Sequence, residues 1–123
     1  MAIKLITQNH LELATLEVRG SLTGDDDTDK VKAAALDLLE QGNRKLVIDL
    51  GQVSYINSSG IGALVHIFTS YTREKGKVKL CRLGKSVENV FVITRLLSVF
   101  DVTETRAEAL KSFESPAVSN KVQ

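Results

Sequence analysis

The alternation of apolar and polar positions predicts strands and helices in turn along this chain. Residues 46–50, LVIDL, form a short apolar run of the kind found in a strand buried on both faces. After it, apolar or small residues recur at the spacing of one helical face, namely Ile61, Leu64, Val65, Phe68 and Thr72. We therefore expect a strand over Lys45–Leu50, a loop to Asn57, and a central helix that Gly76 ends.

The amino-terminal part predicts an antiparallel hairpin followed by a helix. Ile3–Gln8 and Leu11–Arg19 read as strands joined by a tight turn at Asn9-His10. The phase of the second strand slips near Ala14, which indicates a bulge, and Gly20–Gly24 reads as a loop. A helical stripe follows, made of Val31, Ala34, Ala35, Leu38 and Leu39.

The ends of this first helix carry typical capping residues. Asp25 to Thr28 supply acidic and hydroxyl groups, which stabilise a helix amino terminus by accepting hydrogen bonds and by opposing its dipole. Gly42 is placed to end the helix in a left-handed conformation. Three adjacent aspartates also fit a metal site, but the sequence shows no second ligand cluster, so we favour capping and expect no metal.

The second half of the chain continues the alternation. Lys77–Leu83 is expected to be a strand, and Gly84 opens a third helix with Ser86 as its cap. Leu96–Val102 is apolar enough for a last strand, and Thr105 with Glu108 forms a capping box before a short final helix. The stripe of the third helix is Val87, Val90, Phe91 and Thr94. We expect one domain over residues 1–113 and a disordered tail over residues 114–123.

This order of elements defines the fold class. Strands that alternate with helices form right-handed parallel units, here preceded by one antiparallel strand. The sequence therefore predicts an α/β domain with a mixed sheet of about five strands and about four helices.

Composition and charge exclude several classes of function. The chain has 123 residues, with 16 basic and 15 acidic side chains, so no excess charge favours nucleic acid or an anionic membrane. No apolar run reaches the 18 or so residues that span a bilayer, and we expect no membrane insertion. A single cysteine, Cys81, forms no internal disulfide and is expected to pack as a small apolar residue, which suits the cytoplasm.

The candidate functional residues lie where the central helix begins, at Asn57-Ser58-Ser59-Gly60. Serine is a favoured amino-terminal cap, and capping alone would explain a serine here. Gly60 and Gly62 change this picture, because glycine in a helix costs roughly 1 kcal/mol relative to alanine. Two glycines in the first turn indicate that something approaches the backbone closely, either a packing neighbour or a partner protein.

Catalysis by these serines is not supported. The pattern around Ser58 is not Gly-x-Ser-x-Gly, because Ile56 occupies the position of the first glycine. His66 lies about two helical turns beyond Ser58, and His10 falls in the hairpin turn with no evident carboxylate partner. Neither glycine-rich phosphate-binding motif is present, so we expect no enzyme activity and no cofactor. Phosphorylation of the serine itself suits a helix amino terminus better, because the dipole favours the added negative charge there.

The segments VIDL (residues 47–50) and VSYINSSGIGAL (residues 53–64) resemble the signature of the STAS domain family, and more narrowly that of single-domain bacterial anti-sigma factor antagonists. Gly20-Ser21-Leu22 and the segment Thr105–Leu110 agree with the same pattern. The resemblance implies a protein that binds an anti-sigma factor, which is also a serine kinase with a histidine-kinase-like fold, and thereby releases a sigma factor. Phosphorylation would end the complex, and a serine phosphatase would restore it.

Applied to this chain, the resemblance implies that Ser58 is the phosphorylation acceptor. It places Asn57, Ser59, Gly60 and Gly62 in the partner-binding surface. Family members often have aspartate before the acceptor serine, whereas this chain has Asn57. STAS domains also serve as constitutive subunits of signalling or lipid-transport assemblies without a phosphorylation switch, and this is the alternative interpretation.

Overall fold

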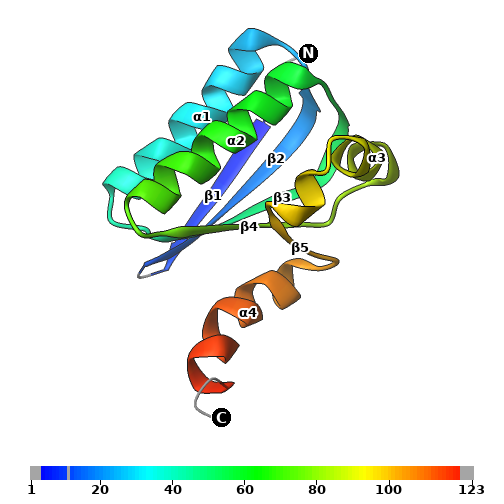
Figure 1. Cartoon of the computed structure of the whole chain (residues 1–123). Helices are drawn as coiled ribbons and strands as arrows, with labels where there is room; N and C mark the ends of the chain where they lie inside the picture. The colour runs from blue at the N-terminus through cyan, green and yellow to red at the C-terminus, as the bar shows by residue number, and fades with distance from the viewer. Residues whose placement is uncertain (1–3, 11, 120–123) are drawn as a thin grey trace.

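The computed structural model describes residues 4–10 and 12–119, which form one mixed sheet covered by helices on both faces (Figure 1). The strands are β1 Lys4–His10, β2 Leu13–Leu22, β3 Lys45–Ile56, β4 Lys77–Cys81 and β5 Asp101–Thr103. The helices are α1 Asp25–Glu40, α2 Ser58–Arg73, α3 Lys85–Ile93 and α4 Arg106–Ser119, with a 3₁₀ turn at Leu96–Ser98.

The strands follow each other across the sheet in sequence order. β1 pairs antiparallel with β2, and every later neighbouring pair is parallel. Helices α1 and α2 lie side by side on one face, and α4 lies on the other (Figure 1). The predicted α/β class, with its antiparallel first strand and parallel units, is confirmed.

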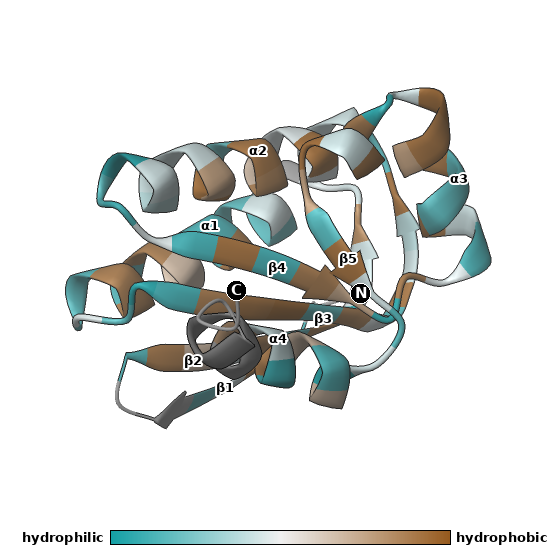
Figure 2. Cartoon of the chain, turned by 60° about the horizontal axis from the view of Figure 1, so that its bottom comes forward, coloured by the Kyte–Doolittle hydropathy of each residue, from teal (hydrophilic) through white to brown (hydrophobic). Residues whose placement is uncertain are grey.

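Alternate residues of the central strands face the two helical layers. Along β3, Leu46, Ile48 and Leu50 belong to the main core, whereas Val47 packs with the α4 residues Ala109 and Phe113. Figure 2 shows the matching alternation of hydrophilic and apolar positions along β4. β3 is therefore buried on both of its faces at the centre of the sheet, as its apolar run predicts.

Cys81 packs in the smaller cluster beneath α4, as expected of a small apolar residue. It is fully buried, and burial raises the pKa of its thiol to about 12. A thiol that stays protonated at neutral pH is a poor nucleophile.

Two predicted helix ends are confirmed in detail. Gly42 has φ +103°, and its N–H donates to the Leu39 carbonyl while the Asn43 N–H donates to the Leu38 carbonyl. This pair of bonds is the Schellman arrangement that a left-handed glycine permits. At the start of α4, the Glu108 N–H donates to Thr105 Oγ1 at 3.0 Å and the Thr105 N–H donates to Glu108 Oε1 at 3.2 Å, which completes the capping box.

Other helix ends differ from the prediction. Gly24 caps α1 and Gly84 caps α3, each without a side-chain hydrogen bond, so neither the Asp25–Thr28 segment nor Ser86 is the cap. The Ser86 hydroxyl instead donates to the Ser54 carbonyl at 3.1 Å. After α2, the left-handed residue is Lys75 with φ +64°, not Gly76.

Several strand limits were also wrong, because pairing with a neighbour decides where a strand ends. The supposed Gly20–Leu22 loop belongs to β2, and β3 runs on to Ile56 rather than ending at Leu50. β2 has its register shifts at residues 17–19 and 20–21 rather than near Ala14. β4 ends at Cys81, and Leu96–Val102 is mostly a 3₁₀ turn before the short β5. Of the hairpin limits, Ile3 and Leu11 lie outside the described residues, and His10 pairs with Leu13.

A buried ion network joins α4 to the sheet. Arg106, the first residue of α4, donates from Nη2 to Glu17 Oε1 at 2.9 Å and pairs with Asp49 Oδ2 at 2.8 Å. Arg82 reaches the same Asp49 oxygen at 3.2 Å, and Arg19 donates to Glu17 at 2.9 Å. Asp49 is fully buried, so these arginines compensate a charge that would otherwise be costly in the interior.

Candidate functional site

The predicted site lies at the carboxyl end of β3, where the chain turns into α2. β3 ends at Ile56, Asn57 is the cap residue, and Ser58 is the first residue of the helix. In parallel sheets this edge gathers the turns that carry functional groups. The structure thus places Asn57, Ser58, Ser59 and Gly60 within one turn, as the sequence indicates.

Asn57, rather than a serine, caps α2. Its Oδ1 accepts hydrogen bonds from the Ser59 N–H at 3.0 Å and from the Gly60 N–H at 3.3 Å. Its backbone carbonyl accepts from the Ile61 N–H at 3.0 Å. The interpretation of Ser58 as a cap is therefore wrong, because Asn57 already performs that task.

The Ser58 side chain is exposed, and it makes no hydrogen bond within residues 4–10 and 12–119. Its hydroxyl consequently lies at the surface, at the positive end of a helix dipole, within reach of another protein. The neighbouring Ser59 is half-buried and is the less accessible of the two hydroxyls.

Hydrogen bonds from Asn57 also connect the start of α2 to the end of β2. The sequence did not predict this contact. Asn57 Nδ2 donates to the Thr23 carbonyl at 2.9 Å, and its backbone N–H donates to the Leu22 carbonyl at 3.2 Å. Because Gly24 caps α1, these bonds hold the starts of α1 and α2 together. The polar Asn57 directly before the predicted central helix was the available signal, but its partner is 34 residues away.

The two glycines of the first turn have different surroundings. Gly60 is buried, and a Cβ there would lie 2.5 Å from the Leu22 carbonyl oxygen and 2.6 Å from Ile56 Cγ1. Gly62 is exposed, and a Cβ there would meet no atom within 4 Å. The neighbour that approaches Gly60 is thus the chain's own β2, while a place for either glycine in a partner surface stays a prediction.

Alanine at these two positions should therefore change stability in opposite directions. Gly60→Ala is expected to lower the free energy of unfolding by about 2 kcal/mol, because its methyl group would push α2 away from β2. Gly62→Ala is expected to raise it by about 0.5–1 kcal/mol, because alanine favours the helix and meets open space. Urea denaturation followed by circular dichroism measures both; equal effects would show that the close contact at Gly60 is absent.

An exposed aromatic residue lies shortly before Ser58 in the chain. Tyr55 lies on β3 just before the turn with 54% of its surface exposed. His66 is exposed further along α2, and the side chain of His10 lies outside the described part of the chain. Within the described residues, no group of three or more histidine, cysteine or acidic side chains could hold a metal ion. None of the described helices has the length and apolar character to cross a membrane.

Sequence comparisons find relatives that are named anti-sigma factor antagonists. BtrV of Bordetella bronchiseptica, provisionally named an anti-sigma factor antagonist, is 29% identical over 89 residues, which cover 72% of this chain and 77% of BtrV. The anti-sigma-B factor antagonist of Bacillus subtilis is 36% identical over 66 residues, which cover 54% of this chain and 60% of that protein.

The fold also matches a solved structure. The anti-sigma factor antagonist SpoIIAA in its unphosphorylated form superposes with a TM-score of 0.76 at 19% identity, covering 93% of this chain and 97% of that one. SpoIIAA of Bacillus in its phosphorylated form gives a TM-score of 0.69 at 18% identity, covering 91% of this chain and 99% of that one. Residues 5–109 match the STAS domain, so the chain belongs to the STAS domain family.

Proposed function

We propose that this protein is an anti-sigma factor antagonist whose binding to its partner is controlled by phosphorylation of Ser58. The observation that carries the proposal is an exposed serine hydroxyl in the first turn of α2 that the fold does not use, because Asn57 caps the helix in its place. The names of the related proteins from Bordetella and Bacillus support the antagonist role.

The partner would be an anti-sigma factor that is also a serine kinase with a histidine-kinase-like fold. In the transfer step, Ser58 Oγ forms a bond to the γ-phosphorus of ATP while the bond to ADP breaks. The hydroxyl proton would leave to a base on the kinase, since the Ser58 hydroxyl forms no hydrogen bond to a described residue that could accept its proton. A serine phosphatase would hydrolyse the phosphoserine, and all of these steps suit a cytoplasmic protein.

The charge of the phosphoryl group would act on the partner more than on this domain. Phosphoserine carries about −1.5 to −2 charges near neutral pH, and the start of a helix tolerates negative charge. The N–H groups of Ser59 and Gly60 already donate to Asn57 Oδ1, and that of Ile61 donates to the Asn57 carbonyl. These three donors are therefore occupied, and the added charge would stay at the surface that Asn57, Ser59, Gly60 and Gly62 are proposed to share with the partner.

Phosphate transfer tests the acceptor directly. Incubated with radiolabelled ATP and the cognate anti-sigma factor, wild-type protein and Ser59→Ala should be labelled, and Ser58→Ala should not. Ser59→Ala is the matched control because it removes the adjacent hydroxyl and leaves the Asn57 cap in place. Equal labelling of wild type and Ser58→Ala would contradict the proposal, and no labelling of any variant would favour a constitutive STAS subunit.

A further inference from the structure

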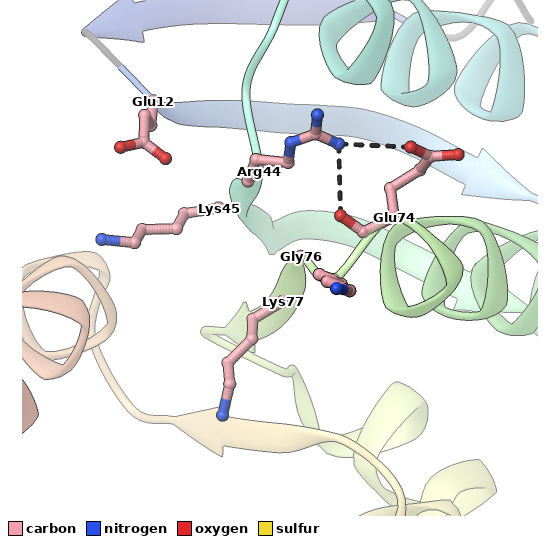
Figure 3. Close-up of a pocket in the computed structure, with 7 residues that line it drawn as sticks. Glu12, Arg44, Lys45, Glu74, Gly76 and Lys77 are labelled. Carbon is pink, nitrogen blue, oxygen red and sulfur yellow. Dashed lines mark hydrogen bonds and ion pairs between the residues drawn. The ribbon is translucent and has the colours of Figure 1, made fainter.

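A second surface lies at the opposite end of the sheet, where the parallel strands begin. Four cationic residues, Arg44, Lys45, Lys75 and Lys77, line a hollow of about 400 Å³ together with Glu12 and Glu74 (Figure 3). Arg44 and Lys75 lie in the loops before β3 and β4, and Lys45 and Lys77 are the first residues of these strands; we call this surface the basic end. None of these residues belongs to the turn between β3 and α2 that carries Ser58.

Backbone contacts hold the three loops of the basic end together. The Lys45 N–H donates to the Glu12 carbonyl at 3.0 Å, and the Lys77 N–H donates to the Arg44 carbonyl at 2.8 Å. Gly76 permits this approach, since a Cβ there would lie 2.5 Å from the Arg44 carbonyl oxygen. The backbone that carries Arg44, Lys45 and Lys77 is thus held in place by hydrogen bonds rather than forming a free loop.

The charges of the basic end are only partly compensated. Arg44 Nη1 donates to the Glu74 carbonyl at 3.2 Å and pairs with Glu74 Oε1 at 3.4 Å, as the dashed lines in Figure 3 show. Within the described residues, Lys45, Lys75 and Lys77 form no ion pair. Lys75 has φ +64°, a conformation that glycine or asparagine adopts more easily, yet lysine occupies it at the rim of the hollow.

A second hollow, lined by both apolar and charged side chains, adjoins the basic one. It measures about 450 Å³ and is lined by Leu36 and Leu39 of α1 with Glu40, and it shares Arg44 and Glu74 with its neighbour. The Arg44–Glu74 pair therefore stands between the cationic hollow and a second hollow that contains two leucines and Glu40. A ligand that crosses this pair would meet positive charge on one side and leucine side chains on the other.

We propose that the basic end binds an acidic segment of a partner protein that also carries an apolar side chain. Carboxylates of the segment pair with Lys45, Lys75 and Lys77, and its apolar side chain enters the hollow beside Leu36 and Leu39. The charge pattern selects an acidic protein segment, and the adjacent leucines select one with a hydrophobic anchor.

The basic end is far enough from Ser58 for both surfaces to be occupied together. Ser58 starts α2 and Arg73 ends it, a span of about 24 Å at 1.5 Å per residue, and the basic end follows directly after Arg73. Binding at the basic end is therefore independent of phosphorylation at Ser58, which separates this inference from the function proposed above.

A peptide titration of the full chain tests the inference. The probe is a fluorescein-labelled peptide of about ten residues, with a Leu-Leu pair flanked by aspartates and glutamates, and the readout is anisotropy. Saturable binding is expected, weakened at least about fivefold between about 20 mM and 300 mM NaCl. Lys45→Glu/Lys77→Glu should weaken it about tenfold or more, and a peptide with serines in place of the leucines should bind several-fold more weakly.

Matched controls decide the outcome. Lys30→Glu/Lys111→Glu makes the same change of net charge at exposed lysines elsewhere, and Ser58→Asp alters the other surface; both should bind the peptide as wild type does. Thermal melting checks that each variant is folded. Non-saturable binding to wild type, or equal weakening by the two double variants, would overturn the inference.

Discussion

Phosphorylation of Ser58 is expected to weaken binding to the anti-sigma factor by at least about 100-fold. The phosphoryl group brings negative charge into the interface, where it meets either negative charge of the partner or no compensating positive charge. Ser58→Asp should reproduce part of this loss, about tenfold or more, since it adds one charge at the same exposed position. The melting temperature should hardly change, because negative charge at the first turn of a helix is tolerated or favoured. Surface plasmon resonance with the immobilised anti-sigma factor, alongside thermal melting, measures both quantities.

Two controls separate the position of the charge from its mere presence. Thr69→Asp adds the same charge on an exposed site near the other end of α2, and Ser58→Ala removes the hydroxyl without adding charge. Both should bind within a few-fold of wild type. If Ser58→Asp binds the partner with full affinity, a negative charge at residue 58 does not affect binding, and the constitutive-subunit interpretation gains support.

Arg106→Leu is expected to lower the free energy of unfolding by about 3 kcal/mol. Removal of one member of a buried ion network leaves its partners without compensation, and such losses reach about 3–5 kcal/mol. In Arg106→Leu, Asp49 would still pair with Arg82, and Glu17 would still pair with Arg19. The expected loss of stability therefore lies at the lower end of this range. Urea denaturation at neutral pH measures it, with Arg19→Gln as the control: the Arg19 side chain is 46% exposed, and its loss should cost less than about 1 kcal/mol.

The same network gives stability a dependence on pH. The hydrogen bond from Arg19, with a smaller contribution from Arg106, holds the pKa of the Glu17 carboxyl below its ordinary value, although burial acts in the opposite direction. A carboxyl whose pKa is lower in the folded state stabilises the fold at pH values above its unfolded pKa. That stabilisation is lost as the pH falls through the folded pKa. The acid-unfolding midpoint of Arg106→Leu should therefore lie at a higher pH than that of wild type, and identical midpoints would exclude this role of Arg106.

The sequence alone was sufficient for the order of elements and for those helix ends that local contacts define. The short apolar run in β3 and the apolar period of 3.6 in α2 predicted a strand followed by a helix, because a strand buried on both faces and a helix buried on one face need these patterns. Gly42 and the Thr105–Glu108 capping box were predictable for the same reason, since all their hydrogen bonds lie within a few residues. The position of Ser58 in the first turn of a helix followed from the same local pattern.

Only the tertiary structure decided which groups the site leaves available. Asn57 donates a hydrogen bond to the Thr23 carbonyl, 34 residues away, and its Oδ1 caps α2. Because Asn57 makes these contacts, the Ser58 hydroxyl is not needed to hold the fold together. Asp49 is a charged residue within the apolar run of β3, and only the fold places Arg106, 57 residues later, beside it. β2 and β3 likewise extend beyond their apolar runs because they pair with each other. Local periodicity is set by the geometry of one element, whereas hydrogen-bond and charge partners depend on which distant segments the folded chain brings within about 3 Å.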